Sequence, residues 1–193
     1  MLRIRFNEAK ATQTAALILK LHRGRMFYVK LMKLLYIIDR EALLRWGRPV
    51  STDRYVSMDN GPVLSRVLNL IVDEPDQAEG RVFWRKYISR PQNFQVSLVR
   101  QAPTDELSRA EEALISEIVE KYRKVGRWQL VDLTHKFGEY KNPDGSMIPI
   151  EYSDILKAVG KTPAQIRSIL SELENISVTD SLLASQKCQP NAY

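Results

Sequence analysis

The chain has 193 residues, of which 44% are hydrophobic, and a formal net charge of +6. This length favours one compact domain over two small ones, and the single cysteine, Cys188, excludes an internal disulfide and fits a reducing compartment. Since no segment approaches the roughly 20 apolar residues that a membrane span requires, we expect a soluble, cytoplasmic protein without a membrane partner.

The positive charge is concentrated in the first third of the chain. Residues 1–60 contain twelve Lys/Arg and five Asp/Glu, whereas the remaining residues are nearly balanced. A basic surface attracts nucleic acid through counterion release, or an acidic protein through electrostatic steering. Charge alone does not choose between these partners, and a solvated basic face is the simplest interpretation.

Two helices are predicted in the N-terminal third. Asn7 is a suitable N-cap for a helix over residues 8–22. A second helix over 27–46 is apolar on nearly all sides, so it belongs in the middle of a small domain. Gly47 ends this helix and Pro49 prevents its resumption. The residues that make its faces apolar are Leu31, Met32, Leu34, Leu35, Tyr36, Ile38, Ala42 and Leu43.

The next segment contains a break that predicts a third helix. In the run Asp59-Asn60-Gly61-Pro62, we expect Asn60 or Gly61 at positive φ and Pro62 in the first turn of the helix, where its missing N–H costs nothing. Residues 54–58 alternate too weakly to assign a strand with assurance.

One β-hairpin is predicted in the middle of the chain. Residues 73–80 form an acidic loop by composition, and apolar residues then alternate over 82–88 and again over 94–98. A loop longer than the tight two-residue type joins these two arms. We expect this hairpin to be the main β element.

The C-terminal half is predicted to be helical again. Thr104 is a good N-cap for a long helix, and shorter helices follow at 127–136 and 152–159, separated by a turn at 141–145. Thr162 caps a last helix that starts at Pro163. Helical periodicity is lost past residue 177.

Together these elements predict a mainly α (α+β) fold. We expect a compact bundle of six or seven helices around a buried central helix, with one small antiparallel β-hairpin. The predicted domain covers residues 1–178, and residues 179–193 form a loose C-terminal tail.

Five short motifs follow one another between residues 30 and 63. They are a KLxKLLY helix, Asp39-Arg40 one turn on, GRP at 47–49, DRYV at 53–56 and GPV at 61–63. This ordered set resembles the Panacea family of SocA-like, phage-associated antitoxins. The resemblance implies neutralisation of a co-encoded protein toxin by direct binding. Some members act as adaptors that hand the toxin to a protease, which leaves open a protease or unfoldase as a second partner.

The motif residues divide into a structural and a partner-binding group. Loops on a rigid helical scaffold present side chains at little ordering cost, so residues 48–62 are the expected recognition surface. Trp84 on the predicted hairpin is either a core anchor or an interface residue. The candidate partner-binding residues are Arg48, Pro49, Asp53, Tyr55, Asp59, Asn60 and Trp84. The candidate structural residues are Lys33, Tyr36, Asp39, Arg40, Gly47, Gly61 and Pro62.

Gly61 and Pro62 also have the simpler interpretation that they turn the chain into the third helix. Asp39 invites a catalytic interpretation, because it is charged and adjoins a very apolar helix. The structural alternative is favoured: we expect the Asp39 carboxylate to accept hydrogen bonds from the backbone, Arg54 or Tyr55, and so to hold the following loop against the helix.

The sequence lacks the side-chain sets that catalysis or metal binding needs. His22 and His135 do not have the spacing of metal ligands, although Asp132 and Glu139 flank His135 at helical spacing. Cys188 has no neighbours that would lower its pKa. We therefore expect no catalytic residue, no metal, no cofactor and no enzymatic activity.

Three functions remain open on the sequence alone. The first is the antitoxin, a binding module. The second is a nucleic-acid-binding regulator that represses its own operon through the basic N-terminal third or the helix–break–helix around Gly126. The segment that follows Gly126 carries few basic residues, which makes nucleic acid the less favoured partner. The third is an enzyme with an unrecognised site.

Overall fold

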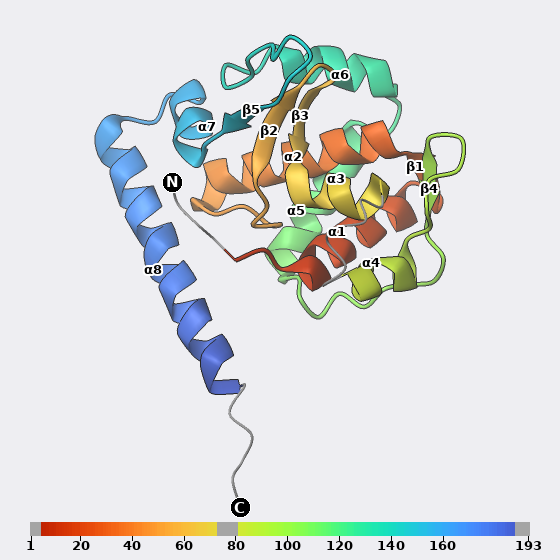
Figure 1. Cartoon of the computed structure of the whole chain (residues 1–193), viewed down its shortest axis with the longest axis horizontal. Coiled ribbons are helices and arrows are strands. Elements are labelled where there is room, and N and C mark those ends of the chain that lie inside the picture. The colour runs from red at the N-terminus through yellow and green to blue at the C-terminus, as the bar shows by residue number, and fades with distance from the viewer. Residues whose placement is uncertain (1–4, 73–80, 188–193) are drawn as a thin grey trace, which may run out of the picture.

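The structure is a computed structural model that describes residues 5–72 and 81–187. Helices predominate in these residues, which also contain two small antiparallel sheets; the sheet of β1 and β4 lies at one edge of the molecule (Figure 1). The helices are α1 (Glu8–Leu21), α2 (Tyr28–Trp46), α3 (Ser65–Val72), α4 (Arg81–Tyr87), α5 (Arg109–Lys121), α6 (Arg127–His135), α7 (Tyr152–Ala158) and α8 (Pro163–Lys187). The strands are β1 (Arg25–Phe27), β2 (Tyr55–Met58), β3 (Gly61–Leu64), β4 (Gln95–Ser97) and β5 (Ile148–Ile150).

Helix α2 is the centre of the molecule, as its apolar sequence predicted. It packs against α1, α5, α6 and β3, and every side chain over residues 30–39 is buried. Each fully buried leucine or isoleucine in it contributes roughly 1.5–3 kcal/mol of burial free energy. The predicted start of the first helix and the predicted end of the second are confirmed. Asn7 caps α1 by accepting a hydrogen bond from the Lys10 N–H (3.0 Å), and Gly47 ends α2 in the left-handed region (φ +71°).

The larger sheet has the strand order β3-β2-β5 and lies over α2. Strands β2 and β3 form a hairpin whose turn residues are Asp59 and Asn60, and Gly61 follows at φ +86°. The predicted positive φ at this break is therefore confirmed at Gly61. In the smaller sheet β1 pairs with β4, with Met26 opposite Val96.

The third helix starts later than predicted, because Pro62 lies in strand β3 and α3 begins at Ser65. Strand β3 is at the edge of its sheet, so the N–H that Pro62 lacks is not needed there. The weakly alternating residues 54–58 contain strand β2, which makes this hairpin, and not residues 82–98, the main one.

The hairpin predicted over residues 82–98 is wrong in its first arm, which is helix α4. Trp84 and Ile88 are both fully buried, and a spacing of four places them on one face of a helix. Over so few residues this spacing cannot be told from alternation. The second arm contains strand β4, which pairs with β1. The two arms do not form a strand ladder with each other; they meet at an isolated bridge between Ile88 and Leu98.

The N-cap predicted at Thr104 is also wrong, because α5 begins at Arg109 with Ser108 as its cap. The Ser108 Oγ accepts from the Glu111 N–H (3.3 Å), and the Glu111 carboxylate accepts from the Ser108 N–H (2.8 Å). This capping box satisfies two backbone groups that Thr104 could not satisfy with Leu107 at the third position. Thr104 instead starts a turn that the Leu107 N–H closes.

The last helix begins at Pro163 as predicted, and Thr162 and Gln165 exchange hydrogen bonds at its start. It runs to Lys187, past the predicted domain boundary at residue 178, and its C-terminal half projects from the body (Figure 1). The predicted acidic loop at 73–80 and the end of the predicted tail, 188–193, lie outside the described residues. The domain boundary itself stays a prediction.

The predicted mainly α (α+β) fold around a buried central helix is confirmed, with eight helices and two small sheets in the described residues. None of the helices over 5–72 and 81–187 has both the length and the apolar character that crossing a membrane requires.

Candidate partner-binding surface

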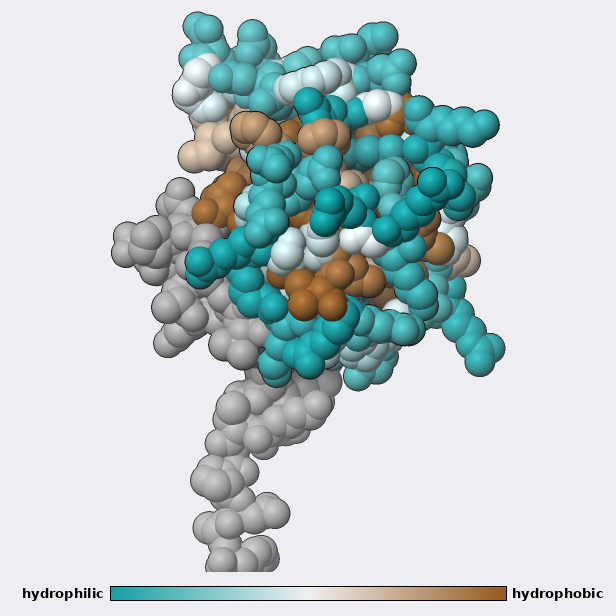
Figure 2. Space-filling view, turned by 90° about the vertical axis from the view of Figure 1, so that its right-hand side faces the viewer, coloured by the Kyte–Doolittle hydropathy of each residue, from teal (hydrophilic) through white to brown (hydrophobic). Residues whose placement is uncertain are grey.

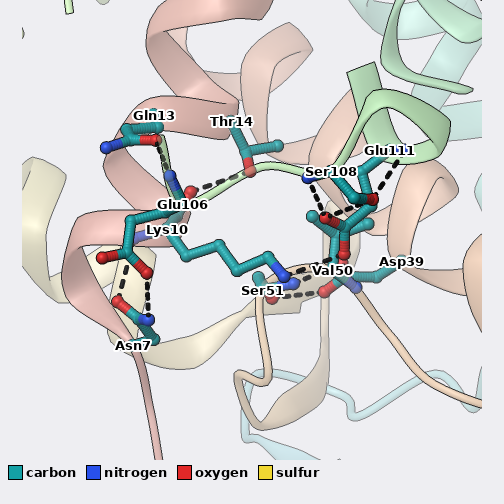
Figure 3. A network of polar contacts seen from close by, with 10 residues as sticks. All are labelled: Asn7, Lys10, Gln13, Thr14, Asp39, Val50, Ser51, Glu106, Ser108 and Glu111. Atoms are coloured by element: carbon teal, nitrogen blue, oxygen red, sulfur yellow. Dashed lines mark hydrogen bonds and ion pairs between the residues drawn. The ribbon is translucent and has the colours of Figure 1, made fainter. Parts of the chain in front are cut away.

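Asp39 holds the loop that follows α2 against the helix. Its Oδ1 accepts from the N–H groups of Val50 and Ser51 (both 2.9 Å; Figure 3). Its Oδ2 accepts from the Ser51 hydroxyl and from the Tyr55 hydroxyl (3.0 Å for the latter). The expected bond from Tyr55 is confirmed, whereas Arg54 is exposed and does not donate to this carboxylate. Burial raises the pKa of Asp39, and the hydrogen bonds from Ser51, Tyr55 and Val50 oppose that effect.

Asp53 is the capping residue of α3, although it lies twelve positions before that helix starts. Its carboxylate accepts from the N–H groups of Arg66 (3.1 Å) and Val67 (2.9 Å), and also from the Arg54 N–H (2.6 Å). The side chain is 2% exposed. Burial raises the pKa of Asp53 to about 6, against the lowering effect of these three N–H groups.

Tyr36 and Arg40 attach α2 to the chain that follows α6. The Tyr36 hydroxyl (3.0 Å) and Arg40 Nε (2.7 Å) both donate to Glu139 Oε1, and the Arg40 guanidinium lies 4.2 Å above the ring of Phe137. Glu139 is 4% exposed, so this ion pair is largely shielded from water. Both motif residues therefore have contacts within the protein.

Lys33 and Gly61 meet where the β2–β3 hairpin approaches α6. Lys33 is 1% exposed, and its Nζ donates to the Pro62 carbonyl (2.7 Å); burial lowers the pKa of its ammonium to about 7. A Cβ on Gly61 would lie 2.8 Å from the Thr134 hydroxyl and 3.1 Å from Lys33 Nζ. With φ at +86° as well, this position accepts glycine alone without strain.

A polar network fixes α1 to the start of α5. Lys10 forms an ion pair with Glu111 (2.8 Å), and Gln13 accepts from the Glu106 N–H (2.9 Å; Figure 3). Asn7 donates to the Glu106 carboxylate (3.0 Å). These bonds join segments about 100 residues apart, so the helices around α2 form a rigid scaffold.

This scaffold carries a pocket of about 650 Å³ at the tip of the β2–β3 hairpin, which we call the hairpin-tip pocket. Its walls come from α2, the hairpin turn, α3 and the loop over 145–147, and they include Val29, Met32, Val63 and Leu68. The Asp59 carboxylate accepts from the Gly145 N–H (3.0 Å) and so holds that loop beside the turn. Met147 at the rim is 63% exposed. This volume and mixed lining are typical of a binding pocket.

The structure divides the residues predicted to bind a partner into two groups. Arg48, Asp59 and Asn60 are exposed, and the last two line the hairpin-tip pocket. Pro49, Asp53, Tyr55 and Trp84 are buried, which argues against a recognition role for them because a partner cannot reach them in the folded protein. Trp84 links α4 to α1 through its backbone N–H, which donates to Glu8 (3.0 Å).

Among the residues that the structure describes, no three histidine, cysteine or acidic side chains come together as a metal site would need. His135, the one histidine with carboxylates at helical spacing, stacks on the ring of Tyr140 at 4.5 Å. Its neighbours in space are thus the hairpin and an aromatic ring.

The family model described as "Antitoxin SocA-like, Panacea domain" matches residues 31–141, which is more than half of the chain. The chain belongs to this family. The matched part of the Panacea domain begins inside α2 and ends after Tyr140, so it contains the Asp39 anchor, the β2–β3 hairpin and Glu139. Comparison with the curated proteins and with the solved structures gave no match.

Three features of this protein were missed in the sequence. Glu139, the partner of Tyr36 and Arg40, carries no local signal because it lies about 100 residues from them. Met147 was not singled out, since a lone apolar residue after a turn is common on protein surfaces. Lys33 was named as a structural residue, but its burial was not foreseen, because it depends on the hairpin, whose Pro62 carbonyl accepts from the Lys33 ammonium.

Proposed function

We propose that this Panacea protein is an antitoxin that neutralises a co-encoded protein toxin by binding it directly, and that it catalyses no reaction itself. The observation that carries the proposal is the family match, since it spans the central helix and the hairpin that build the rigid scaffold. An inhibitor that acts by covering its target benefits from such rigidity, because little conformational entropy is lost on binding.

The hairpin-tip pocket is the surface that we assign to the toxin. Asp59 and Asn60 supply polar groups beside an apolar floor, and Met147 supplies an exposed apolar side chain at the rim. A fixed apolar pocket with a polar border is the usual form of the centre of a protein interface. The whole contact would need on the order of 1,600 Å² of buried surface, so it extends well beyond this pocket.

The test is co-expression with the product of the adjacent reading frame. That protein alone should arrest growth, growth should recover when the antitoxin is present, and the two proteins should elute together from a sizing column. A neighbour that is harmless, or that arrests growth equally in both cases and forms no complex, would contradict the proposal.

The surface is tested by one pair of variants. Met147→Glu should lower the affinity for the toxin by about tenfold or more, because it replaces an exposed apolar side chain at the rim of the pocket with a charge. Val178→Glu is the matched control, since Val178 on α8 is exposed to a similar extent (56%) but lies outside this pocket. If both variants bound the toxin with equal affinity, the contact would lie on another surface.

Stoichiometry separates a binder from an enzyme. In an assay with purified toxin, a binder neutralises at most an equal molar amount of toxin. If a much smaller molar amount of antitoxin than of toxin still gave full protection, the antitoxin would be acting catalytically. The non-enzymatic part of the proposal would then be wrong. An adaptor role adds a further expectation, which is a shorter toxin half-life in cells that contain the antitoxin.

A further inference from the structure

A second pocket, of about 840 Å³, lies between β1, the connection from α5 to α6, and the first turn of α6. We call it the basic pocket, because six of its lining residues are cationic and none is acidic. The six are Arg23, Arg25, Lys30, Arg123, Lys124 and Arg127. Among the described residues, Arg123 is the one member of this set in an ion pair, with Glu120 at 2.6 Å.

The positive charge of this pocket comes from two distant parts of the chain. Arg23, Arg25 and Lys30 belong to the basic N-terminal third, and the other three cations lie about 100 positions later. Lys30 joins the two parts, since its Nζ donates to the Arg123 carbonyl (3.0 Å) and lies 3.2 Å from His22 Nε2. Cations of the N-terminal third and cations of the connection from α5 to α6 therefore line the same pocket.

The same pocket also presents aromatic surface. Trp128 is 53% exposed, and the Arg127 guanidinium lies 3.7 Å from the ring centroid of Phe27 and 5.3 Å from that of Trp128. Figure 2 looks onto the side of the molecule on which β1, β4 and α6 lie in Figure 1, and it shows hydrophobic patches set among hydrophilic side chains. Tryptophan and arginine are the residues most often found at the energetic centres of protein interfaces.

The start of α6 adds a further preference for negative charge. Its N-cap is Gly126, which has no side chain to cap the first turn, and the Gly126 N–H itself donates to Gln129 Oε1 (2.8 Å). The free N–H groups of a first turn and the helix dipole both favour an anion.

We propose that the basic pocket binds an acidic segment of a partner protein that also carries an aromatic or aliphatic side chain. Carboxylates of the segment pair with the cations other than the buried Lys30 and with the start of α6. The apolar side chain packs on Trp128 and on the Arg127–Phe27 pair. This inference rests on the proposed function, because it assigns the chemistry by which the toxin is recognised.

An acidic polypeptide fits this site better than a nucleic-acid strand does. A strand needs a continuous track of positive charge for its phosphates. Here the six cations line one pocket, while Glu120 beside Arg123 and Asp132, one helical turn after Trp128, are both exposed. A phosphate backbone that extended past the pocket would meet these carboxylates.

The pocket is tested without the toxin by a fluorescently labelled peptide that repeats Glu-Phe-Asp-Leu, at low and at high salt. Lys124→Glu and Trp128→Ala should each weaken its binding by about tenfold. Both side chains are exposed, so the melting temperatures should stay unchanged. The matched control is Lys157→Glu, an exposed lysine on α7, which should bind the peptide as the wild type does.

Two further probes decide the ligand class. A peptide that repeats Glu-Ser-Asp-Ser has the same charge without the apolar side chains and should bind more weakly. An oligothymidylate of equal charge should also bind more weakly, and tighter binding of this oligonucleotide would overturn the proposal in favour of nucleic acid. Equal binding of the peptide by all three variants would overturn it as well.

The same variants are then tested for binding to the co-encoded protein. If the wild type binds that protein and Lys124→Glu and Trp128→Ala bind it as tightly, the inference fails while the proposed function stands. If the wild type does not bind it, the proposed function fails, and the peptide assay decides whether the basic pocket binds acidic segments.

Discussion

At the scale of single residues, the buried charges of this protein act as structural ties. The Asp39 carboxylate accepts hydrogen bonds from the loop after α2, and the Asp53 carboxylate caps α3. The Glu139 carboxylate accepts hydrogen bonds from Tyr36 and Arg40. Each carboxylate joins two segments that are separate in the chain. Removal of one partner from such a site is costly, because the remaining polar groups stay buried without a hydrogen bond.

Asp39→Ala should therefore lower the free energy of unfolding by about 3 kcal/mol or more, since it leaves the buried Val50 and Ser51 N–H groups without acceptors. Urea denaturation measures this change. Glu41→Ala is the control on the same helix: Glu41 pairs with Arg45 at the surface, so its loss should cost no more than about 1 kcal/mol. Similar losses for both variants would show that Asp39 does not hold the loop.

Lys33 makes the stability depend on pH in a direction opposite to that of most surface lysines. Its pKa falls from 10.5 to about 7 on burial, so between these values the unfolded chain binds a proton that the folded protein does not. The Lys33 contribution to stability should therefore rise from about pH 7 to about pH 10.5, with a slope of at most roughly 1.4 kcal/mol per pH unit. Lys33→Met should remove this rise in denaturation curves; an unchanged pH profile would contradict a lowered pKa.

At the scale of elements, the close approach of the β2–β3 hairpin to α6 depends on the absence of a side chain at Gly61. Gly61→Ala should cost about 2–4 kcal/mol, because it adds a contact with Thr134 and Lys33 to the cost of a positive φ. Gly160→Ala separates the two effects, since Gly160 has φ +80° but nothing within 4 Å of a Cβ, and about 1 kcal/mol is expected there. Thermal or urea unfolding measures both.

The start of α5 offers a direct comparison between the predicted and the observed N-cap. Ser108→Ala should lower the free energy of unfolding by about 1 kcal/mol, because it removes the acceptor of the Glu111 N–H. Thr104→Ala should change it by less than about 0.5 kcal/mol, since Thr104 is exposed and its backbone alone bonds to Leu107. A larger loss for Thr104→Ala than for Ser108→Ala would mean that Thr104 is the N-cap of α5, as predicted from the sequence.

At the scale of the whole molecule, the two pockets share no lining residue, although Phe27 of the basic pocket and Tyr28 of the hairpin-tip pocket are neighbours in the chain. One partner of ordinary interface size could contact both. The double variant Met147→Glu and Lys124→Glu should then lose the sum of the two single losses in binding free energy, measured by titration calorimetry. A double variant no weaker than one single variant would restrict the contact to one pocket.

Much of the helical frame follows from local patterns. Asn7 and Gly47 bound their helices because a cap acts through bonds to its nearest neighbours in the chain. The segment around Trp84 and the start of α3 were mispredicted for the opposite reason. A short apolar run fits a helix or a strand equally, and Pro62 suits an edge strand as well as a first helical turn.

By itself the sequence determined the class of the fold, the buried central helix and the family, because these depend on composition, periodicity and an ordered set of motifs. The tertiary structure alone decided which candidate residues reach the surface and where the cations gather. Asp53 and Trp84 are covered by segments far along the chain, and Lys30 meets Arg123 across 93 positions. Contacts of this kind arise only when distant elements pack together, so no local pattern carries them.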